Sequence, residues 1–500
     1  MLLTPRAIYN DVKNNDLDKT SALELIITLI ENTEDVKTRL ECIDILEKIN
    51  ITNKRVFKFL ENLLISDSNE RIRSLSAKVL KNLFLEDAIP PMKWALKNET
   101  SLNCLIFIIT YLSEIESIKA RTFLIKKVNE INKKKYKYNL KDIIEGLDIQ
   151  NLSNKELVEI LINYYIISSL KLKFGYVKFE KNESGAIINL DLSNVEYQGL
   201  GLSKLNESLE SILSLTFLKK LDLSNNHLKL LPDNINQFNS LEQLDLSFNS
   251  LTFLPESIAA FSSLKVLNLK SNHIKFLPES LGSLSNLETL ILRDNFLREL
   301  PESCSSLNSL RILDLHHNKL SEINNKLSRL TNLKELELGW NNLKEVPNII
   351  KDLKSIRKLN LGRNDLNNIP DWIKSSESLK VLNLYDNVLK SLPNSFHFLK
   401  KLVELNLRNN KFTELPHCIS KLTSLKILNL SWNSIDFIPN WIDSLKSLEL
   451  LNLWGNNLKE IPDSIESLQN LKTLYLNFNK IDDLSKPLRV LKERGVTIKI

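Results

Sequence analysis

The chain has 500 residues, more than one compact domain usually holds, so at least two regions are predicted. With 43% apolar and 26% charged residues, the composition is that of a globular protein and excludes a disordered chain. The net charge of +6 is small for this length, which argues against a nucleic-acid-binding domain.

Several classes of protein are disfavoured by what the sequence lacks. No stretch approaches 18 uninterrupted apolar residues, and the first residues lack the apolar run of a signal peptide. The four cysteines form no CxxC pair, which is typical of a reducing compartment, so we expect a cytoplasmic protein. Glycine is scarce and no GxxxxGK[ST] or GxGxxG motif occurs, which disfavours nucleotide hydrolysis. We expect no cofactor.

Residues 1–169 predict an all-α region. Apolar residues recur at helical spacing, and the Pro90-Pro91 pair should prevent one helix from continuing there. The predicted helices are 20–33, 36–49, 54–66, 70–85, 101–113, 118–131 and 154–169.

Two segments of this region look related. Asp35–Arg39 leads into IDIL, and Asn69–Ser74 leads into AKVL, at a spacing of roughly 35 residues; a third, less similar segment opens at Asn98. Paired helices at this spacing resemble HEAT-type repeats, which implies a HEAT-like helical-repeat domain.

Residues 119–141 are locally basic, with Glu130 as the only acidic side chain. Such a run can bind a membrane surface, nucleic acid or an acidic partner, but a solvated helix end and loop is the favoured interpretation. Membrane and nucleic-acid partners are therefore kept only as an alternative.

Residues 170–217 predict a strand-rich N-terminal cap with an atypical first repeat. LKLKFGYVKFE, residues 170–180, alternates apolar and charged residues as a strand does, and could form a hairpin with residues 186–192. The unit at 187–217 is longer than later units and has Val195 where they have asparagine. At the other end, residues 485–500 predict a C-terminal cap with a helix, a turn at Gly495 and a strand.

Residues 218–484 repeat one 23-residue pattern, LxxLxLxxNxLxxLPxxIxxLxx. Each residue is numbered below by its position in the unit, counted from the first residue. Positions 4 and 6 are apolar and alternate with polar positions, as in a strand with one buried face. Position 9 is asparagine throughout, and position 15 is proline except at Asn324. Full copies begin at Leu218, Leu241, Leu264, Leu287, Leu310, Leu333, Ile356, Leu379, Leu402, Leu425 and Leu448.

This unit resembles the leucine-rich repeat of the short class found in Ras-associated scaffolds and their plant counterparts. The resemblance implies an α/β fold class, a leucine-rich repeat solenoid with a parallel sheet on the concave face. It also implies a ladder of buried asparagines, each bonding the backbone of its turn and of the next repeat. Such scaffolds bind proteins on the concave face, so a non-catalytic adaptor in small-GTPase or phosphatase and kinase signalling is expected.

The outward strand positions 2, 3, 5, 7 and 8 vary between copies, so partner specificity should reside there. Exposed Trp, Tyr and Arg are the residue types that anchor protein interfaces. Two groups stand out, a central one and a C-terminal one. The predicted partner-binding residues are Arg293, Trp340, Arg357, Arg363 and Tyr385 in the first, and Arg408, Trp432, Trp454, Tyr475 and Phe478 in the second.

An enzymatic alternative rests on Cys42. Cys42-Ile43-Asp44 is similar to the Cys-x-Asp nucleophile motif of bacterial effectors that join leucine-rich repeats to a ubiquitin-ligase domain. However, Cys42 lies in an apolar helical pattern, and a reactive thiolate needs exposure and a lowered pKa. The adjacent His316 and His317 are a poor chelating pair, so neither an enzyme nor a metal site is predicted.

Overall fold

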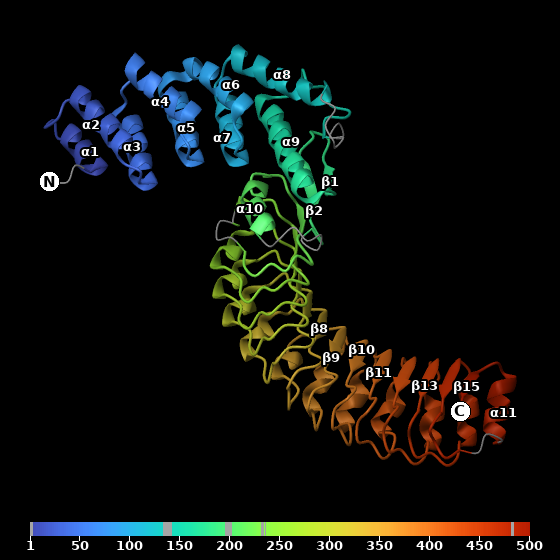
Figure 1. Cartoon of the computed structure of the whole chain (residues 1–500). Coiled ribbons are helices and arrows are strands. Elements are labelled where there is room, and N and C mark those ends of the chain that lie inside the picture. The colour runs from blue at the N-terminus through green and yellow to red at the C-terminus, as the bar shows by residue number, and fades with distance from the viewer. Residues whose placement is uncertain (1–3, 134–142, 196–202, 232–234, 236, 482–484) are drawn as a thin grey trace. The chain divides into compact units, whose positions relative to one another are not determined.

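The computed structural model describes residues 4–133, 143–195, 203–231, 235, 237–481 and 485–500. The chain divides into two compact units (Figure 1). The helical unit comprises residues 1–190 and 203–218, and the solenoid unit comprises residues 191–202 and 219–500. Among the described residues, no helix is both long and apolar enough to cross a membrane.

The helical unit contains the predicted helices and three that were not predicted, the last of which lies in the segment predicted to be a strand-rich cap. Its helices are α1 (Pro5–Lys13), α2 (Lys19–Asn32), α3 (Val36–Ile49), α4 (Lys54–Ser66), α5 (Glu70–Phe84), α6 (Ile89–Asn98), α7 (Leu102–Ser113), α8 (Ile118–Lys133), α9 (Asn154–Phe174) and α10 (Ser203–Ile212). Helix α6 begins where an interruption was expected, because its prolines lie in the first turn, where proline needs no N–H partner. Helix α1 likewise begins at a proline, after the capping side chain of Thr4.

The strand predicted over residues 170–180 was wrong in its first half. Helix α9 continues to Phe174 and ends at Gly175, whose φ of 79° suits a glycine at a helix end. The hairpin itself is present, with β1 (Lys178–Lys181) and β2 (Ile187–Asp191) joined by a turn in which the Asn182 N–H donates to the Ala186 carbonyl at 2.9 Å. The alternating pattern of residues 170–174 wrongly predicted a strand, because these residues form the last turn of a long helix that is largely buried.

Helix pairs α2–α3, α4–α5 and α6–α7 pack in sequence, and each pair is tied to the next by an arginine. Arg39 in α3 pairs with Asp67 at the end of α4, and Arg73 in α5 pairs with Glu99 at the end of α6. Both arginines come from the two related segments of the sequence. The prediction of helical pairs is confirmed, while their assignment to the HEAT family stays a prediction.

The solenoid unit is built on parallel strands that follow chain order. They are β3 (Lys220–Asp222), β4 (Gln243–Asp245), β5 (Val266–Asn268), β6 (Thr289–Ile291), β7 (Ile312–Asp314), β8 (Glu335–Glu337), β9 (Lys358–Asn360), β10 (Val381–Asn383), β11 (Glu404–Asn406), β12 (Ile427–Asn429), β13 (Leu450–Asn452), β14 (Thr473–Tyr475) and β15 (Thr497–Lys499). Leu382 pairs with Leu405 and Leu405 with Leu428, so identical positions lie side by side. The predicted solenoid with its sheet on the concave face is therefore confirmed.

From the repeat that begins at Leu241 to the repeat that begins at Leu448, each return segment carries a short 3-10 helix on the convex side. These helices are η5 (Glu256–Ala260), η6 (Glu279–Ser283), η7 (Glu302–Ser306), η8 (Asn325–Arg329), η9 (Asn348–Lys351), η10 (Asp371–Ser375), η11 (Asn394–Phe398), η12 (His417–Lys421), η13 (Asn440–Ser444) and η14 (Asp463–Ser467). Proline at position 15 precedes all but η8. There Asn324 compensates, because its side chain accepts the Lys326 N–H at 2.9 Å.

The position-9 asparagines form the expected buried ladder, with one correction. The Asn341 Nδ2 donates to the Leu338 carbonyl of its own repeat at 3.1 Å and to the Leu315 carbonyl of the preceding repeat at 3.0 Å. Its Oδ1 accepts the N–H of Leu320, also in the preceding repeat, at 3.0 Å. The ladder thus bonds backward along the chain, not to the next repeat as expected.

After the last full repeat, α11 (Lys486–Glu493) packs against η14, and β15 pairs in parallel with β14. Gly495 makes the turn between them with a φ of 86°. These elements are the ones predicted for the C-terminal segment. That they act as a cap, and that the domain boundaries fall at 169, 217 and 484, stays a prediction.

Candidate functional site

The residue at position 8 lies three residues after the end of its strand and has a left-handed backbone conformation. Trp340, Arg363, Trp432 and Phe478 have φ values of 55°, 57°, 55° and 55°. This conformation is unfavourable for bulky side chains and often marks functional sites. Here it recurs in nearly every repeat, so it belongs to the turn that precedes the ladder asparagine and is not evidence of a site.

A C-terminal aromatic cluster is formed by Trp432, Trp454 and Phe478, from three consecutive repeats. The ring centroids lie 6.2 Å apart for the two tryptophans, 5.9 Å for Trp454 and Phe478, and 6.5 Å for Trp432 and Phe478. The side chains are 46%, 37% and 73% exposed. They form an apolar platform that is stacked internally and open to solvent.

Gly455 allows the Trp432 ring to pack closely against the backbone of the next repeat. It has position 8 in the repeat between Trp432 and Phe478, with a φ of 67°. A Cβ there would lie 3.1 Å from the Trp432 ring, so a larger residue would push the indole away. The sequence interpretation missed Gly455, although its place between two position-8 aromatics was readable from the repeat numbering.

The two other residues of the predicted C-terminal group lie outside this cluster. Tyr475 is half-buried in β14 and makes no ring contact with the cluster among the described residues. Arg408 is exposed, and its side chain forms no hydrogen bond or ion pair with any part of the chain that the structure describes.

The central cluster is formed by Trp340, Arg363 and Tyr385, with Asp386. The Arg363 guanidinium lies 3.5 Å from the centre of the Trp340 ring, a close cation–π contact. The Trp340 Nε1–H donates to the Tyr385 hydroxyl at 2.9 Å, and the Arg363 Nε lies 3.6 Å from an Asp386 carboxylate oxygen. Gly362 allows this arrangement, because a Cβ there would lie 2.1 Å from the Tyr385 ring. Asp386 and Gly362 were not predicted.

A second layer of contacts holds the other side of Trp340. His317 meets its ring edge-on at 5.2 Å and bonds Asp294 through Nδ1 at 2.7 Å. Arg293 also approaches Asp294, with its Nε at 3.5 Å. Arg357, by contrast, is exposed and contacts no side chain of the cluster among the described residues, so the predicted group is only partly brought together.

His316 lies beneath this layer and is only 8% exposed. Burial, helped by the positive charge of Arg293, lowers the pKa of His316 to about 4. The neutral imidazole is therefore part of the packing under Trp340. Within the described residues, no group of three or more His, Cys, Asp or Glu side chains could hold a metal ion.

Position 5 carries a row of asparagines that runs from the repeat of Arg363 to the repeat of Trp454. The Oδ1 of Asn360, Asn406 and Asn429 each accepts the N–H of position 7 in the same repeat, at 3.0, 3.1 and 3.0 Å. Their Nδ2 groups donate to no partner in the described residues. The middle of the sheet therefore presents uncharged donors, flanked by aromatic groups.

Position 2 carries charges that are paired across neighbouring repeats toward both ends of the sheet. Glu449 bonds both Lys426, at 2.9 Å, and Lys472, at 2.6 Å, and these bonds lower the pKa of Glu449 to about 2. Glu242 similarly lies between Lys219 and Lys265. Such exposed pairs contribute little to stability. Position 2 is basic in four consecutive repeats, at Arg311, Lys334, Arg357 and Lys380. Glu242, Glu288 and Glu449 interrupt the row elsewhere, so no basic track runs the length of the sheet.

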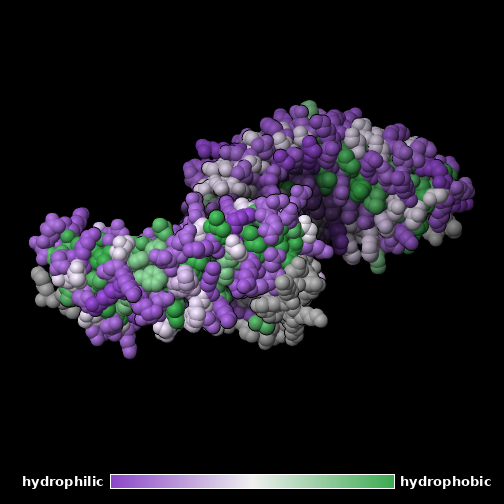
Figure 2. Space-filling view, turned by 90° about the horizontal axis from the view of Figure 1, so that it is seen from above, coloured by the Kyte–Doolittle hydropathy of each residue, from purple (hydrophilic) through white to green (hydrophobic). Residues whose placement is uncertain are grey.

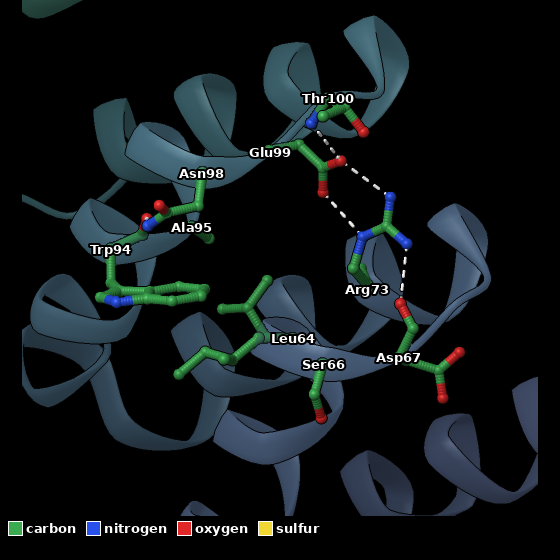
Figure 3. A pocket seen from close by; sticks show the side chains of 10 residues that line it. Leu64, Ser66, Asp67, Arg73, Trp94, Ala95, Asn98, Glu99 and Thr100 are labelled. Atoms are coloured by element: carbon green, nitrogen blue, oxygen red, sulfur yellow. Dashed lines mark hydrogen bonds and ion pairs between the residues drawn. The ribbon is translucent and has the colours of Figure 1, made fainter.

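The helical unit presents two cavities at equivalent places in successive helix pairs. One, of about 180 Å³, is lined by Leu64, Trp94 and the Arg73–Glu99 pair (Figure 3). Arg73 donates to both Glu99 carboxylate oxygens at 2.7 Å, while Trp94 is 46% exposed. The other, of about 600 Å³, is lined in part by Arg39 and Phe59.

The two alternative sites are Cys42 and the basic stretch of residues 119–141. Cys42 is fully buried, and burial raises the pKa of its thiol to about 11, the opposite of what a nucleophile requires. In the basic stretch, Lys119 pairs with Glu86 at 3.5 Å and Lys127 with Glu130 at 3.1 Å. Residues 134–141 of that stretch lie outside the described residues.

Three family models match the repeats. A model described as leucine-rich repeat region matches residues 258–361, and one described as leucine rich repeat matches 216–274, 354–412 and 415–458. A model of two leucine rich repeats matches residues 446–489. No curated protein matches the chain.

Solved structures of repeat proteins are similar to this chain. A leucine-rich repeat protein of Leptospira interrogans is 31% identical, with 68% of this chain and 98% of that chain covered and a TM-score of 0.48. A TDR receptor is 28% identical, covering 59% of this chain and 52% of that chain, with a TM-score of 0.51. The plant peptide hormone receptor RGFR1, solved in complex with RGF2, is 28% identical, covering 54% and 49%, with a TM-score of 0.45. The chain thus spans about half the length of the two receptors.

Proposed function

The chain is a leucine-rich repeat protein, and we propose that it is a non-catalytic interaction scaffold that binds a protein partner on its concave face. The observation that carries this proposal is the exposed stack of Trp432, Trp454 and Phe478. Neither tryptophan is needed to fill the solenoid core, because the buried leucines and the asparagine ladder already do so.

The chemistry of the concave face suits a folded protein or a peptide. Large aromatic side chains and arginine are the groups that contribute most to protein interfaces. The position-5 asparagine row adds uncharged donors for backbone carbonyls, and the charges at position 2 are mixed. A nucleic-acid ligand would instead need a continuous basic track.

A small GTPase, or the phosphatase and kinase machinery around one, is the partner class proposed from the resemblance to Ras-associated scaffolds. A cytoplasmic location is part of this proposal. The four cysteines are unpaired and buried, which agrees with a reducing compartment. The helical unit is proposed to bind a second partner or to position the first.

The two alternatives receive less support. The buried, high-pKa thiol of Cys42 offers no accessible nucleophile for a ubiquitin-ligase reaction. Part of the basic stretch is already ion-paired, which weakens its case as a membrane or nucleic-acid adaptor.

Comparative affinity purification tests the concave-face proposal. Full-length wild type is compared with Trp432→Ala/Trp454→Ala and Trp340→Ala/Arg363→Ala. Trp441→Ala, in the convex helix η13, is the matched control. We expect at least one concave variant to lose a partner that wild type and the control retain. If both concave variants retain every wild-type partner while their circular dichroism is unchanged, the concave face is not the binding surface.

A further inference from the structure

A row of exposed apolar side chains lies away from the concave positions, at position 13 of three consecutive repeats. Leu230, Phe253 and Phe276 are 52%, 50% and 60% exposed. We call these three residues the lateral ridge. On the face that Figure 2 draws, apolar residues reach the surface as patches within a largely hydrophilic exterior. Exposed apolar side chains at equivalent positions of consecutive repeats are therefore a candidate interaction surface.

The lateral ridge is not part of the core. The adjacent position 14 supplies the core side chain in each repeat, with Leu231, Leu254 and Leu277 at most 8% exposed. Apart from Phe437, the other full repeats place Glu, Asn or Ser at position 13 and keep the same fold. The fold therefore does not require an apolar residue at this position.

The backbone next to the lateral ridge holds the repeats at close, regular spacing. The position-10 N–H of one repeat donates to the position-11 carbonyl of the preceding repeat, as in Ser250 to Leu228 and His273 to Leu251, both at 2.8 Å. Such bonding sets a step of about 4.8 Å between neighbouring chains. Position 13 is two residues further along, so the ridge side chains follow one another at a similar step.

A neighbouring aromatic pair widens the lateral ridge. Phe296, at position 10 of the next repeat, is 37% exposed and stacks on His273 with ring centroids 5.8 Å apart. Lys319 lies over the Phe296 ring at 4.8 Å. The apolar surface thus ends at a polar boundary one repeat beyond Phe276.

Past that boundary, position 13 becomes acidic in three consecutive repeats. Glu299, Glu322 and Glu345 are exposed and form no ion pair with the residues that the structure describes. This differs from the acidic residues at position 2, which are bonded to neighbouring lysines. One line of equivalent positions therefore carries three apolar side chains followed by three available carboxylates.

We propose that this line binds an amphipathic helix of a partner protein, with an apolar stripe followed by lysine or arginine on the same face. Helical residues at i, i+3/i+4 and i+7 advance about 5 Å per contact, close to the step of about 4.8 Å between repeats. Side chains on one face of an extended strand advance about 6.7 Å, which loses register within three repeats. The carboxylates of Glu299, Glu322 and Glu345 would pair with the lysine or arginine side chains of the bound helix.

The probe is a synthetic helical peptide with leucines at i, i+4 and i+7 and lysines on the same face of the following turns. A second peptide replaces the lysines with glutamates. Binding to the full-length protein is measured by fluorescence anisotropy. Wild type should bind the leucine–lysine peptide about tenfold more tightly than the leucine–glutamate peptide, as expected when several charge contacts reverse sign.

Each test variant is compared with a control variant that is also substituted at position 13. Phe253→Ser/Phe276→Ser should weaken binding of the leucine–lysine peptide about tenfold, since central apolar anchors dominate interfaces. Phe437→Ser, at an equally exposed position 13 near the C-terminal end, should not. Glu322→Lys/Glu345→Lys should reverse the preference and favour the leucine–glutamate peptide, whereas Glu414→Lys/Glu460→Lys, also at position 13, should not.

The proposal is overturned if wild type binds neither peptide, or if Phe437→Ser weakens binding as much as the ridge variant does. It also fails if the peptide preference does not respond to the Glu322→Lys/Glu345→Lys exchange. Trp432→Ala/Trp454→Ala should bind the peptides as wild type does, so this test is independent of the concave-face proposal.

Discussion

The absence of a Cβ atom at Gly362 leaves the space that the Tyr385 ring of the central cluster occupies. A Cβ at this position would overlap the Tyr385 ring, whose hydroxyl accepts the Trp340 N–H. Gly362→Ala should displace Tyr385, cost about 1–3 kcal/mol through overpacking, and weaken binding to a concave-face partner. Tyr385→Phe should have a smaller effect, since it removes only the hydroxyl. Calorimetric binding and urea unfolding check both; equal behaviour of Gly362→Ala and wild type would contradict the arrangement.

His316 should make the solenoid sensitive to acid. Burial and Arg293 lower the pKa of His316 from 6.5 to about 4, so the unfolded chain takes up the proton more readily than the folded one. The stabilisation is fully present above about pH 6.5 and is lost as the pH falls through 4. His316→Asn should therefore lose less unfolding free energy than wild type between pH 7 and pH 4.5. His273→Asn, at an exposed histidine, should follow wild type in the same urea titrations.

Arg73 is expected to matter more to stability than an exposed arginine does. Its side chain is 14% exposed and Glu99 is 4% exposed, and the pair is bidentate. Burial raises the pKa of Glu99, but the bonds from Arg73, Cys104 and the Ser101 backbone outweigh it and leave the pKa at about 2. Arg73→Ala should cost about 3 kcal/mol, the usual effect of orphaning a buried charge.

Arg55→Ala is the control, because the Arg55–Glu24 pair is exposed and should contribute less than about 1 kcal/mol. The measurement is the urea midpoint of the transition that reports the helical unit. Similar midpoints for the two variants would show that the Arg73–Glu99 pair does not hold the helix pairs together.

Part of the candidate site could be predicted from the residue types at the outward positions of the repeat. Trp432 and Trp454 were predicted to be neighbours because the 23-residue period fixes which residues lie side by side. Asp386 and Gly362 were missed because their roles depend on rotamers and close approach, which the period does not specify. Arg357 and Arg408 were included because of residue type alone, and their side chains reach no cluster in the described structure.

At the scale of elements, the asparagine ladder joins each turn to the one before it. Asn341→Ala should leave the buried Leu320 N–H without its partner, whereas the Leu315 and Leu338 carbonyls keep the Nδ2 donors of Asn318 and Asn364. We expect a loss of about 1–3 kcal/mol from the unsatisfied N–H. Asn342→Ala, at the exposed neighbouring position, should stay within about 0.5 kcal/mol of wild type. Thermal unfolding followed by circular dichroism distinguishes the two, and equal losses would argue against the ladder.

The spacing of apolar residues predicted the strands and most helices because it reflects which face of each element is buried. The spacing gave wrong predictions where a proline or tertiary packing determined the secondary structure. The Pro90-Pro91 pair was interpreted as a break, yet prolines in a first turn favour the start of a helix, here α6. Residues 170–174 alternate like a strand, but they continue the long, buried α9, whose tertiary packing overrides the local pattern.

At the scale of the whole molecule, the solenoid separates stability from recognition. Leucines, prolines and ladder asparagines fix the fold, while the outward positions are free to carry a binding surface on the concave face and another on the lateral ridge. The repeat family was predictable from the sequence because every copy of the repeat has the same pattern of buried positions. The partner was not predictable, since the variable positions show only which chemical groups lie on the surface.

Site-specific photocrosslinking tests the concave-face claim most directly. Phe478→p-benzoylphenylalanine places the crosslinker on the aromatic cluster, and Phe398→p-benzoylphenylalanine places it on convex helix η11, where Phe398 is 50% exposed. Irradiation of the full-length protein in its native cells should yield a covalent partner adduct from position 478 and none of that adduct from position 398. The account is contradicted if both positions give the same adducts, or if only position 398 captures a partner.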